Sequence, residues 1–281
     1  MKLLHTGLLM GMLSGWPLVA GAQLKLQAGA GTQAVFGGGV REISVLWQNT
    51  NTLTFSNALN AQVLQASSTT VAPLGAQAWK TLRVLPGQTA IESASLNFPA
   101  VKAPTRFIVQ WLLSTNRVLG ETDVFVYPTN LLAELKLLVV PSENNLGVLD
   151  PEKQLQPALK QAGISFVDLG NTRLTTFAGK LALVGPCRAS DPEWPELAGR
   201  IRRLAQNGVP VVWIQSSPPK ADALWPSFYL VPAGRAGVLV VDPGLVAGLP
   251  DRPQAQRNLI FFCKLALNPQ PPALPELTLQ P

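Results

Sequence analysis

Residues 194–215 read WPELAGRIRRLAQNGVPVVWIQ, and this stretch decides the fold class of the second half of the chain. The apolar residues of its first part recur at helical spacing: Leu197, Ile201 and Leu204. They predict a helix over residues 194–206, and Asn207-Gly208 is a typical helix end. The apolar run that follows predicts a buried strand over residues 209–215. A helix followed at once by a buried strand is typical of a crossover unit in a parallel sheet.

The same alternation of strand and helix extends to both sides of this stretch. Further buried strands are expected at residues 135–140, 164–169, 181–184, 228–231 and 238–241. Helices are expected at residues 152–162 and 254–267, the first of them kinked by Pro157. The pattern predicts an α/β domain over residues 133–268 with a doubly wound, flavodoxin-like parallel sheet, followed by a proline-rich tail over residues 269–281.

Residues 23–132 show a different pattern, in which short runs of alternating apolar and polar residues are separated by glycine and proline. Such runs lie at residues 42–48, 81–84, 107–111 and 123–127. A period of two with one apolar face is typical of antiparallel strands. Several short strands in about 110 residues predict an all-β, immunoglobulin-like sandwich, and this segment lacks the cysteines of the immunoglobulin disulfide.

Residues 1–22 have the composition of a signal peptide. Lys2 supplies the positive charge, a short apolar stretch follows, and Ala20-Gly21-Ala22 fits the small-residue cleavage pattern. Maturation is expected to begin at Gln23. The apolar stretch is short for a membrane span and no later run is longer, so the mature protein is expected to be secreted or periplasmic, in a bacterium, and not membrane-spanning.

Composition excludes several kinds of function. Charged residues make up 14 % of the chain, and its net charge of +6 is spread thinly, so no nucleic-acid partner is expected. The single histidine, His5, lies in the predicted signal peptide. A mature chain without histidine has no Ser-His or Cys-His pair and no imidazole metal site. We therefore expect no metal. We also expect no cofactor, because residues 29–34, which match the dinucleotide-binding pattern G-x-G-x-x-A, precede no helical pattern and favour a turn.

Cys187 is a weak candidate nucleophile. It follows the strand predicted at residues 181–184, and parallel sheets place their chemistry at the carboxyl ends of strands. A reactive thiolate needs a base or a depressed pKa, and only Arg188 is nearby to lower the pKa. A buried thiol, or half of a disulfide with Cys263, is the simpler interpretation.

Carboxylates are the other catalytic option, because glycoside hydrolysis uses two of them. Asp168 and Asp242 end predicted strands and are the best-placed candidates, although Asp242-Pro243-Gly244 is also an ordinary turn. The Asp-Pro-Glu runs at residues 150–152 and 191–193 are interpreted as helix starts, with aspartate as the N-cap.

Tryptophan rings can stack on sugars. Three of them lie near predicted turns or helix starts and are candidate ligand-binding residues: Trp79, Trp194 and Trp225. Trp47, Trp111 and Trp213 lie in apolar registers and are predicted to be core residues.

The order of these parts resembles accessory modules of secreted bacterial glycoside hydrolases of the β-galactosidase type. Residues 79–86, 98–100 and 106–113 are similar to the immunoglobulin-like sandwiches of those enzymes. Residues 181–186 and 206–212 resemble the strand–helix–strand segment of class I glutamine-amidotransferase-like domains. That family's catalytic histidine has no counterpart here, and the chain has no room for a catalytic barrel. The resemblance implies a stand-alone relative of accessory domains.

Two functions follow from these observations. The first is a non-catalytic, exported binding or accessory protein whose ligand is a glycan or an envelope protein. The second is a weak carboxylate-dependent hydrolase with a crevice at the carboxyl ends of the α/β sheet. The missing histidine and the scarcity of paired acids favour the first.

Overall fold

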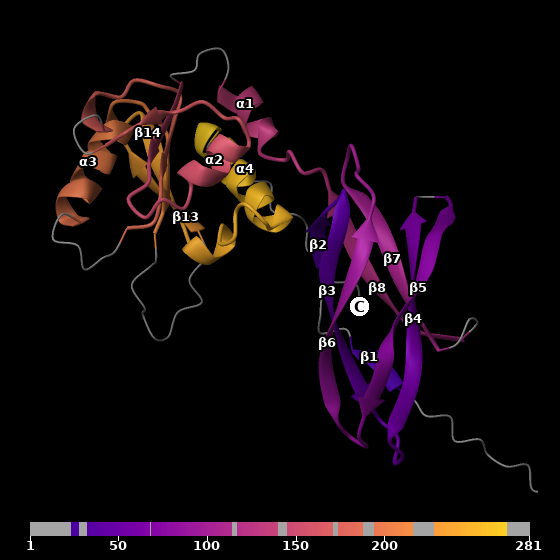
Figure 1. Cartoon of the computed structure of the whole chain (residues 1–281). Coiled ribbons are helices and arrows are strands. Elements are labelled where there is room, and N and C mark those ends of the chain that lie inside the picture. Colours follow the sequence, from indigo (N-terminus) through magenta and orange to yellow (C-terminus); the bar gives the residue numbers. More distant parts are fainter. Residues whose placement is uncertain are drawn as a thin grey trace, which may run out of the picture.

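The computed structural model describes residues 24–27, 33–67, 69–113, 117–139, 145–170, 174–187, 194–215 and 228–268. Figure 1 shows two bodies: a β body built from β1–β8, and an α/β body built from α1–α4 and β9–β14. No helix in the described ranges is long and apolar enough to cross a membrane. The predicted signal peptide and the proline-rich tail lie outside the described residues.

The β body consists of two sheets that face each other across one core. Its strands are β1 (Leu24–Gln27), β2 (Gln33–Phe36), β3 (Gly39–Asn49), β4 (Phe55–Ala66), β5 (Val71–Val84), β6 (Thr89–Phe98), β7 (Thr105–Leu113) and β8 (Arg117–Tyr127). One sheet has the order β1-β3-β6 and the other β2-β8-β7-β4-β5. The strands pair antiparallel except β2, which runs parallel to β8.

Alternation along the strands explains this packing. In β3 the residues Ile43, Val45 and Trp47 are buried, while their neighbours Glu42 and Ser44 are exposed. The buried residues of both sheets form one cluster. Its centre holds Trp47, whose ring meets that of Trp111 edge-on at 6.1 Å between centroids. The predicted core roles of these two tryptophans are therefore confirmed.

The α/β body contains one largely parallel sheet. Its strands are β9 (Leu146–Leu149), β10 (Val167–Asp168), β11 (Leu181–Val184), β12 (Val211–Ile214), β13 (Phe228–Ala233) and β14 (Ala236–Val241). Their order is β10-β9-β11-β12-β14-β13. β13 pairs antiparallel with β14. The sheet is therefore mixed, whereas the sequence pattern predicted a parallel one.

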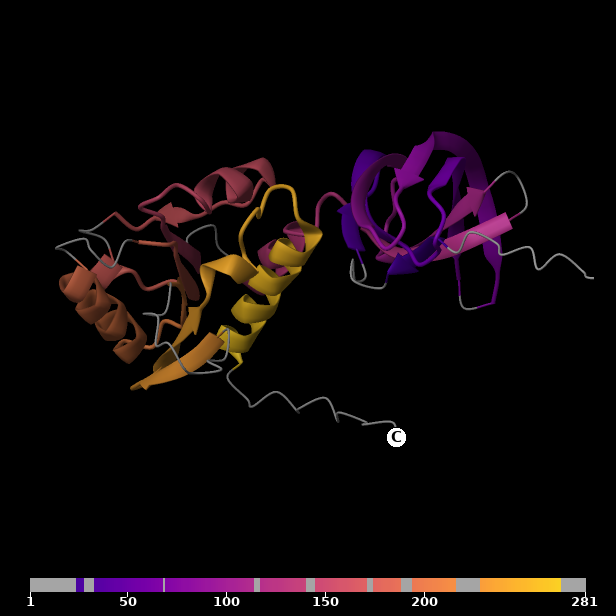
Figure 2. The same cartoon turned by 90° about the horizontal axis from the view of Figure 1, so that it is seen from below.

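Helices cover both faces of this sheet, as Figure 2 shows for α3 and α4. The helices are α1 (Ala133–Val139), α2 (Gln156–Gln161), α3 (Trp194–Gln206) and α4 (Pro253–Leu267), with 3-10 turns η3 (Leu174–Thr176) and η4 (Pro243–Leu245). α1, α2 and α4 pack with one face of the sheet in one cluster, and α3 and η3 pack with the other face in a second cluster. The central strands are buried on both faces, which explains their continuous apolar runs.

The prediction of a strand at residues 135–140 was wrong, because residues 133–139 form helix α1. Leu135 and Val139, four residues apart, are buried, whereas Leu137 between them is 75 % exposed. A spacing of four fits a helix. In a run as short and apolar as residues 135–140, however, the pattern alone does not distinguish a helix from a strand. The first strand of this body is instead β9, whose short sequence Leu-Gly-Val-Leu was not predicted as a strand.

Three other elements are shorter than predicted: α2, β10, and β12, which covers Val211–Ile214 where residues 209–215 were expected. Helix α2 begins at Gln156, so Pro157 lies in its first turn, where proline is tolerated and causes no kink. The strand predicted at residues 164–169 is reduced to β10 at Val167–Asp168. By contrast, β11 and α3 have the predicted bounds, and Gly208 after α3 has a φ of 98°.

Candidate functional site

The carboxyl edge of the α/β sheet is the first place to look for a site. Between β9 and β11 the strand order changes direction, and open α/β sheets bind ligands at such a point. Asp150 follows β9, Cys187 lies just after β11, and Gln215 follows β12. At the two sides of the edge lie Asp168, which ends β10, and Asp242, which follows β14.

Asp150 is buried, and its carboxylate accepts hydrogen bonds from three backbone N–H groups. One oxygen accepts a hydrogen bond from Gln154 N at 3.0 Å, and the other accepts from Leu155 N at 2.7 Å and Gln156 N at 2.8 Å. A side chain at position 185 would place its Cβ 2.6 Å from Asp150 Oδ1. The backbone at Gly185 therefore lies so close to the Asp150 carboxylate that only glycine fits there. The prediction that Asp150 is the N-cap was wrong, because α2 begins at Gln156 with Leu155 as its N-cap; Asp150 instead binds the backbone N–H groups of residues 154–156 from a turn before the helix.

The two predicted catalytic carboxylates lie far apart. In the sheet order, β10 and β14 are separated by β9, β11 and β12. Four strand spacings of about 4.8 Å place Asp168 and Asp242 roughly 19 Å apart across the sheet. A glycosidase needs its two carboxyl groups about 5–10 Å apart. Both side chains are exposed, and Asp242 accepts a hydrogen bond from Gly244 N at 2.7 Å, which is the turn role also weighed from the sequence.

Asp150 does not supply the missing partner. Asp150 directly follows β9, the strand that pairs with β10. Its two carboxylate oxygens already accept three backbone hydrogen bonds. These three bonds give the carboxylate a structural role at the start of the segment that leads into α2.

The thiol of Cys187 is half-buried and donates a hydrogen bond to Gln215 Oε1 at 3.4 Å. An amide oxygen accepts from a neutral thiol but takes no proton, so it is not the base that a cysteine nucleophile requires. Gln215 was not predicted as a site residue, and its only signal in the sequence is that it is a polar residue at the end of a buried strand.

Cys263 lies in a different layer from Cys187. It belongs to the cluster that packs with α4 on one face of the sheet, whereas Cys187 packs against the cluster on the other face. The two cysteines form no disulfide. Full burial raises the pKa of the Cys263 thiol to about 12, so it stays protonated and unreactive in the fold.

The tryptophan candidates have different surroundings. Trp79 of β5 is half-buried, donates from Nε1 to Ser93 O at 3.2 Å, and packs on Trp111 with 4.7 Å between ring centroids. Lys80 Nζ lies 5.4 Å from the centre of the Trp79 ring. Trp194 begins α3, but its side chain lies outside the described residues, as does Trp225.

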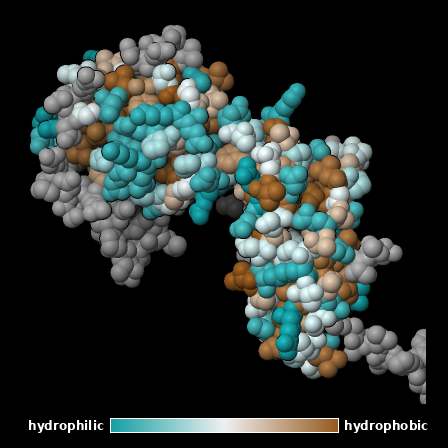
Figure 3. Space-filling view, in the orientation of Figure 1, coloured by the Kyte–Doolittle hydropathy of each residue, from teal (hydrophilic) through white to brown (hydrophobic). Residues whose placement is uncertain are grey.

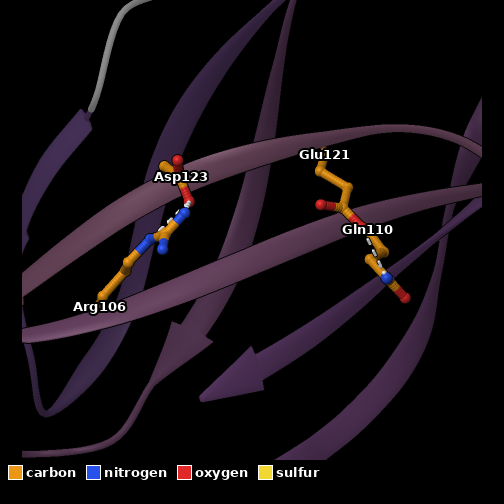
Figure 4. A network of polar contacts seen from close by, with 4 residues as sticks. All are labelled: Arg106, Gln110, Glu121 and Asp123. Carbon is orange, nitrogen blue, oxygen red and sulfur yellow. Dashed lines mark hydrogen bonds and ion pairs between the residues drawn. The ribbon is translucent and has the colours of Figure 1, made fainter. Parts of the chain in front are cut away.

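The outer face of the five-stranded sheet carries an ordered polar network. Arg106 of β7 donates from Nε and Nη2 to Asp123 Oδ1 of β8, at 2.9 and 2.7 Å. Next to it, Gln110 Nε2 donates to Glu121 Oε1 at 2.8 Å, as Figure 4 shows. These groups satisfy one another across two paired strands. Over the viewed face of the β body, Figure 3 shows apolar and polar residues interspersed.

The described residues contain two notable hollows. A cleft of about 320 Å³ opens on the β body between β4, β5 and β6, and a second hollow of about 450 Å³ lies beside β10 in the α/β body. The second is lined by Val167, Leu169 and Phe177 and lies away from Cys187 and Asp242. Within the described part of the chain, no group of three or more acidic, cysteine or histidine residues could hold a metal ion.

Comparison with known proteins gives only distant similarities. No family model matches the chain. No curated protein matches it either. Among solved structures, the alkylpurine DNA glycosylase of Pseudomonas fluorescens is 15 % identical with a TM-score of 0.29, covering 38 % of this chain and 31 % of its own.

Family 3 β-glucosidases are also similar over part of the chain. The enzyme of Bifidobacterium adolescentis is 12 % identical with a TM-score of 0.26, covering 37 % of this chain and 17 % of its own. The β-glucosidase of Listeria innocua is 13 % identical with a TM-score of 0.27, covering 38 % and 16 %. The chain therefore spans less than a third of the length of each of these structures.

Proposed function

We propose that this protein is an exported, non-catalytic binding or accessory protein whose ligand is a glycan or an envelope protein. The observation that carries the proposal is the placement of the acids at the carboxyl edge. Asp168 and Asp242 end strands at opposite sides of the sheet, roughly 19 Å apart, and the oxygens of Asp150 are used by the backbone. Among the described residues at this edge, the arrangement offers no acid–base pair.

The proposal includes a finer assignment of the two bodies. The order β10-β9-β11-β12-β14 corresponds to the 2-1-3-4-5 order of flavodoxin-like sheets, with β13 added at the edge. In such sheets the loop after the first strand binds a phosphate through backbone amides. Here the Asp150 carboxylate occupies those amides, which fits an α/β domain that has no nucleotide to bind.

The proposal likewise assigns the β body to the immunoglobulin-like sandwiches. Its two sheets enclose one core, and the first strand is divided between them as β1 and β2. A sandwich beside an α/β domain is the order of parts found in accessory modules of secreted glycoside hydrolases. The signal-peptide composition of residues 1–22 supports a secreted or periplasmic location.

Affinity electrophoresis tests the proposal. The full chain, expressed for export and purified in its exported form, is run through gels that contain laminarin, xylan, hydroxyethyl cellulose, soluble starch or dextran. Retardation by one polymer, or recovery of one defined partner from an envelope pull-down, is the expected result. Release of reducing sugar from any of these polymers, abolished by Asp168→Asn or Asp242→Asn, would instead establish the hydrolase and overturn the proposal.

A further inference from the structure

The cleft of the β body lies along its open side, where the edge strands β5 and β6 of the two sheets approach each other. We call this side the seam. The pairing of β4 with β5 changes register between Val63 and Leu64, which are opposite Gly75 and Pro73, so Leu74 forms a bulge without a partner. The bulge coincides with the cleft, because Leu74 and Gly75 line it.

Small residues keep this cleft open. Ala61 and Val63 of β4 line it, and both are core residues with little exposure. No atom lies within 4 Å of the place where a Cβ would stand on Gly75, so that side of the cleft is open space. Leu74 is 48 % exposed at its border. The result is a concave site with an apolar floor, at the small end of the range for ligand pockets.

The rim of the cleft carries two amide side chains from opposite sheets. Gln77 of β5 donates from Nε2 to Ser95 O of β6 at 3.0 Å, which fixes the side chain and leaves Oε1 as an acceptor. Asn97 of β6 also lines the cleft and is exposed. An apolar floor with amide donors and acceptors at the rim matches a ligand that has apolar faces and hydroxyl groups at its edge.

The seam continues from the cleft past a tryptophan. Trp79 follows Gln77 by two positions on the same strand, a step of about 7 Å. Its Nε1 donates to Ser93 O, as Gln77 does to Ser95 O, so both side chains bridge the two sheets in the same way. Beyond it, Lys80 pairs with Glu92 across the seam. Trp79 is itself the unpaired residue at a second change of register between β4 and β5, and its half-buried ring packs on Trp111 further along the seam.

We propose that the cleft binds one sugar ring of a glycan, with Asn97 and Gln77 contacting its hydroxyl groups and the chain extending along the seam toward Trp79. This inference rests on the proposed binding function and commits it to a glycan. Neutral hydroxyl groups both donate and accept hydrogen bonds, as amides do, and the C–H faces of a sugar ring suit the apolar floor.

The test uses two variants at the cleft and two controls on β4. Asn97→Ala removes a rim amide, and Ala76→Trp fills the cleft, which Ala76 lines. Asn57→Ala and Ala58→Trp make the same changes at exposed positions outside it. Thermal unfolding is measured for all four to establish that they fold. With the polymer that retards the full chain most, we expect each cleft variant to lose about tenfold in affinity and each control to bind as the original chain does.

Three distinguishable outcomes would overturn the inference. If a polymer retards the full chain and both folded cleft variants equally, the glycan lies elsewhere and the binding function stands. If none of the five polymers retards the chain and a pull-down recovers a defined protein, the cleft is not a glycan site and the binding function stands through that partner. Turnover of a polymer would remove both proposals.

Discussion

The β body and the α/β body satisfy their polar groups in different ways. In the β body, Gln77 and Trp79 bridge two open sheet edges by hydrogen bonds to backbone carbonyl groups, and amide groups remain at the surface beside an apolar cleft. In the α/β body, the carboxylates of Asp242 and Asp150 at the carboxyl edge accept hydrogen bonds from nearby backbone N–H groups. Among the described residues, the amide groups beside the β-body cleft therefore remain at the surface, whereas the Asp150 and Asp242 carboxylates accept hydrogen bonds from nearby backbone.

The two bodies also differ in how they expose side chains. Strands of the β body such as β3 have one buried face, whereas β9, β11 and β12 are buried at every position. The two bodies meet where α4 lies against β2. There Arg257 of α4 donates to the Tyr127 hydroxyl at 2.7 Å and lies 5.3 Å from the centre of its ring. Because each body has core clusters of its own, we expect the two cores to unfold independently.

A matched pair of core substitutions gives the largest expected effect. Leu96 of β6 and Leu183 of β11 are both fully buried, one in each body. Leu96→Ala and Leu183→Ala should each cost about 2–5 kcal/mol, because each leaves a cavity in a packed core. In denaturant unfolding followed by circular dichroism, each variant should shift only the transition of its own body. A single transition shifted equally by both would show that the bodies unfold as one.

Removal of the buried carboxylate should have the next largest effect. Asp150→Ala leaves backbone N–H groups at residues 154–156 without their acceptor, which should lower the stability of the α/β body by about 2–3 kcal/mol. Asp150→Asn retains one oxygen acceptor and should cost less. The same unfolding measurement checks both, and an Asp150→Ala chain as stable as the original would contradict the structural role assigned to this carboxylate.

The two cysteines should differ in reactivity. At pH 8 in the folded chain, a thiol reagent should modify Cys187 and leave Cys263 unmodified, and in guanidinium it should modify both. Burial raises the pKa of Cys263 from 9.0 to about 12, so its contribution to stability is complete below pH 9 and falls as the pH rises toward 12. Cys263→Ala should remove that part of the pH dependence. Modification of neither thiol in guanidinium without reductant would indicate a disulfide and contradict the fold.

The contact between the bodies should give the smallest effect on stability. Arg257→Ala removes both the hydrogen bond and the cation–π contact with Tyr127, at a cost of about 1 kcal/mol or less because the arginine is exposed. Tyr127→Phe retains the ring and should cost less still. Small-angle scattering should show a broader range of distances between the bodies for Arg257→Ala, and an unchanged profile would mean that other contacts fix their arrangement.

Much of the fold followed from local pattern. Period-two runs such as residues 42–48 predicted strands of the β body, because alternation records one buried face. The helix at residues 194–206 and the strand at residues 181–184 were also predicted with the correct bounds. The pattern was insufficient at residues 135–140, where six residues are too few to distinguish a half-buried helix from a buried strand.

Sequence alone determined the absence of histidine after residue 22, the alternating and continuous apolar runs, and therefore the chemistry and the secondary structure that are possible. Tertiary structure decided which residues meet. The strand order placed Asp168 and Asp242 at opposite sides of one sheet, and the bulge at Leu74 opened a cleft beside Asn97, which lies more than twenty positions away in the sequence. Such distances depend on the pairing of remote strands, because pairing and not sequence separation fixes which side chains are neighbours.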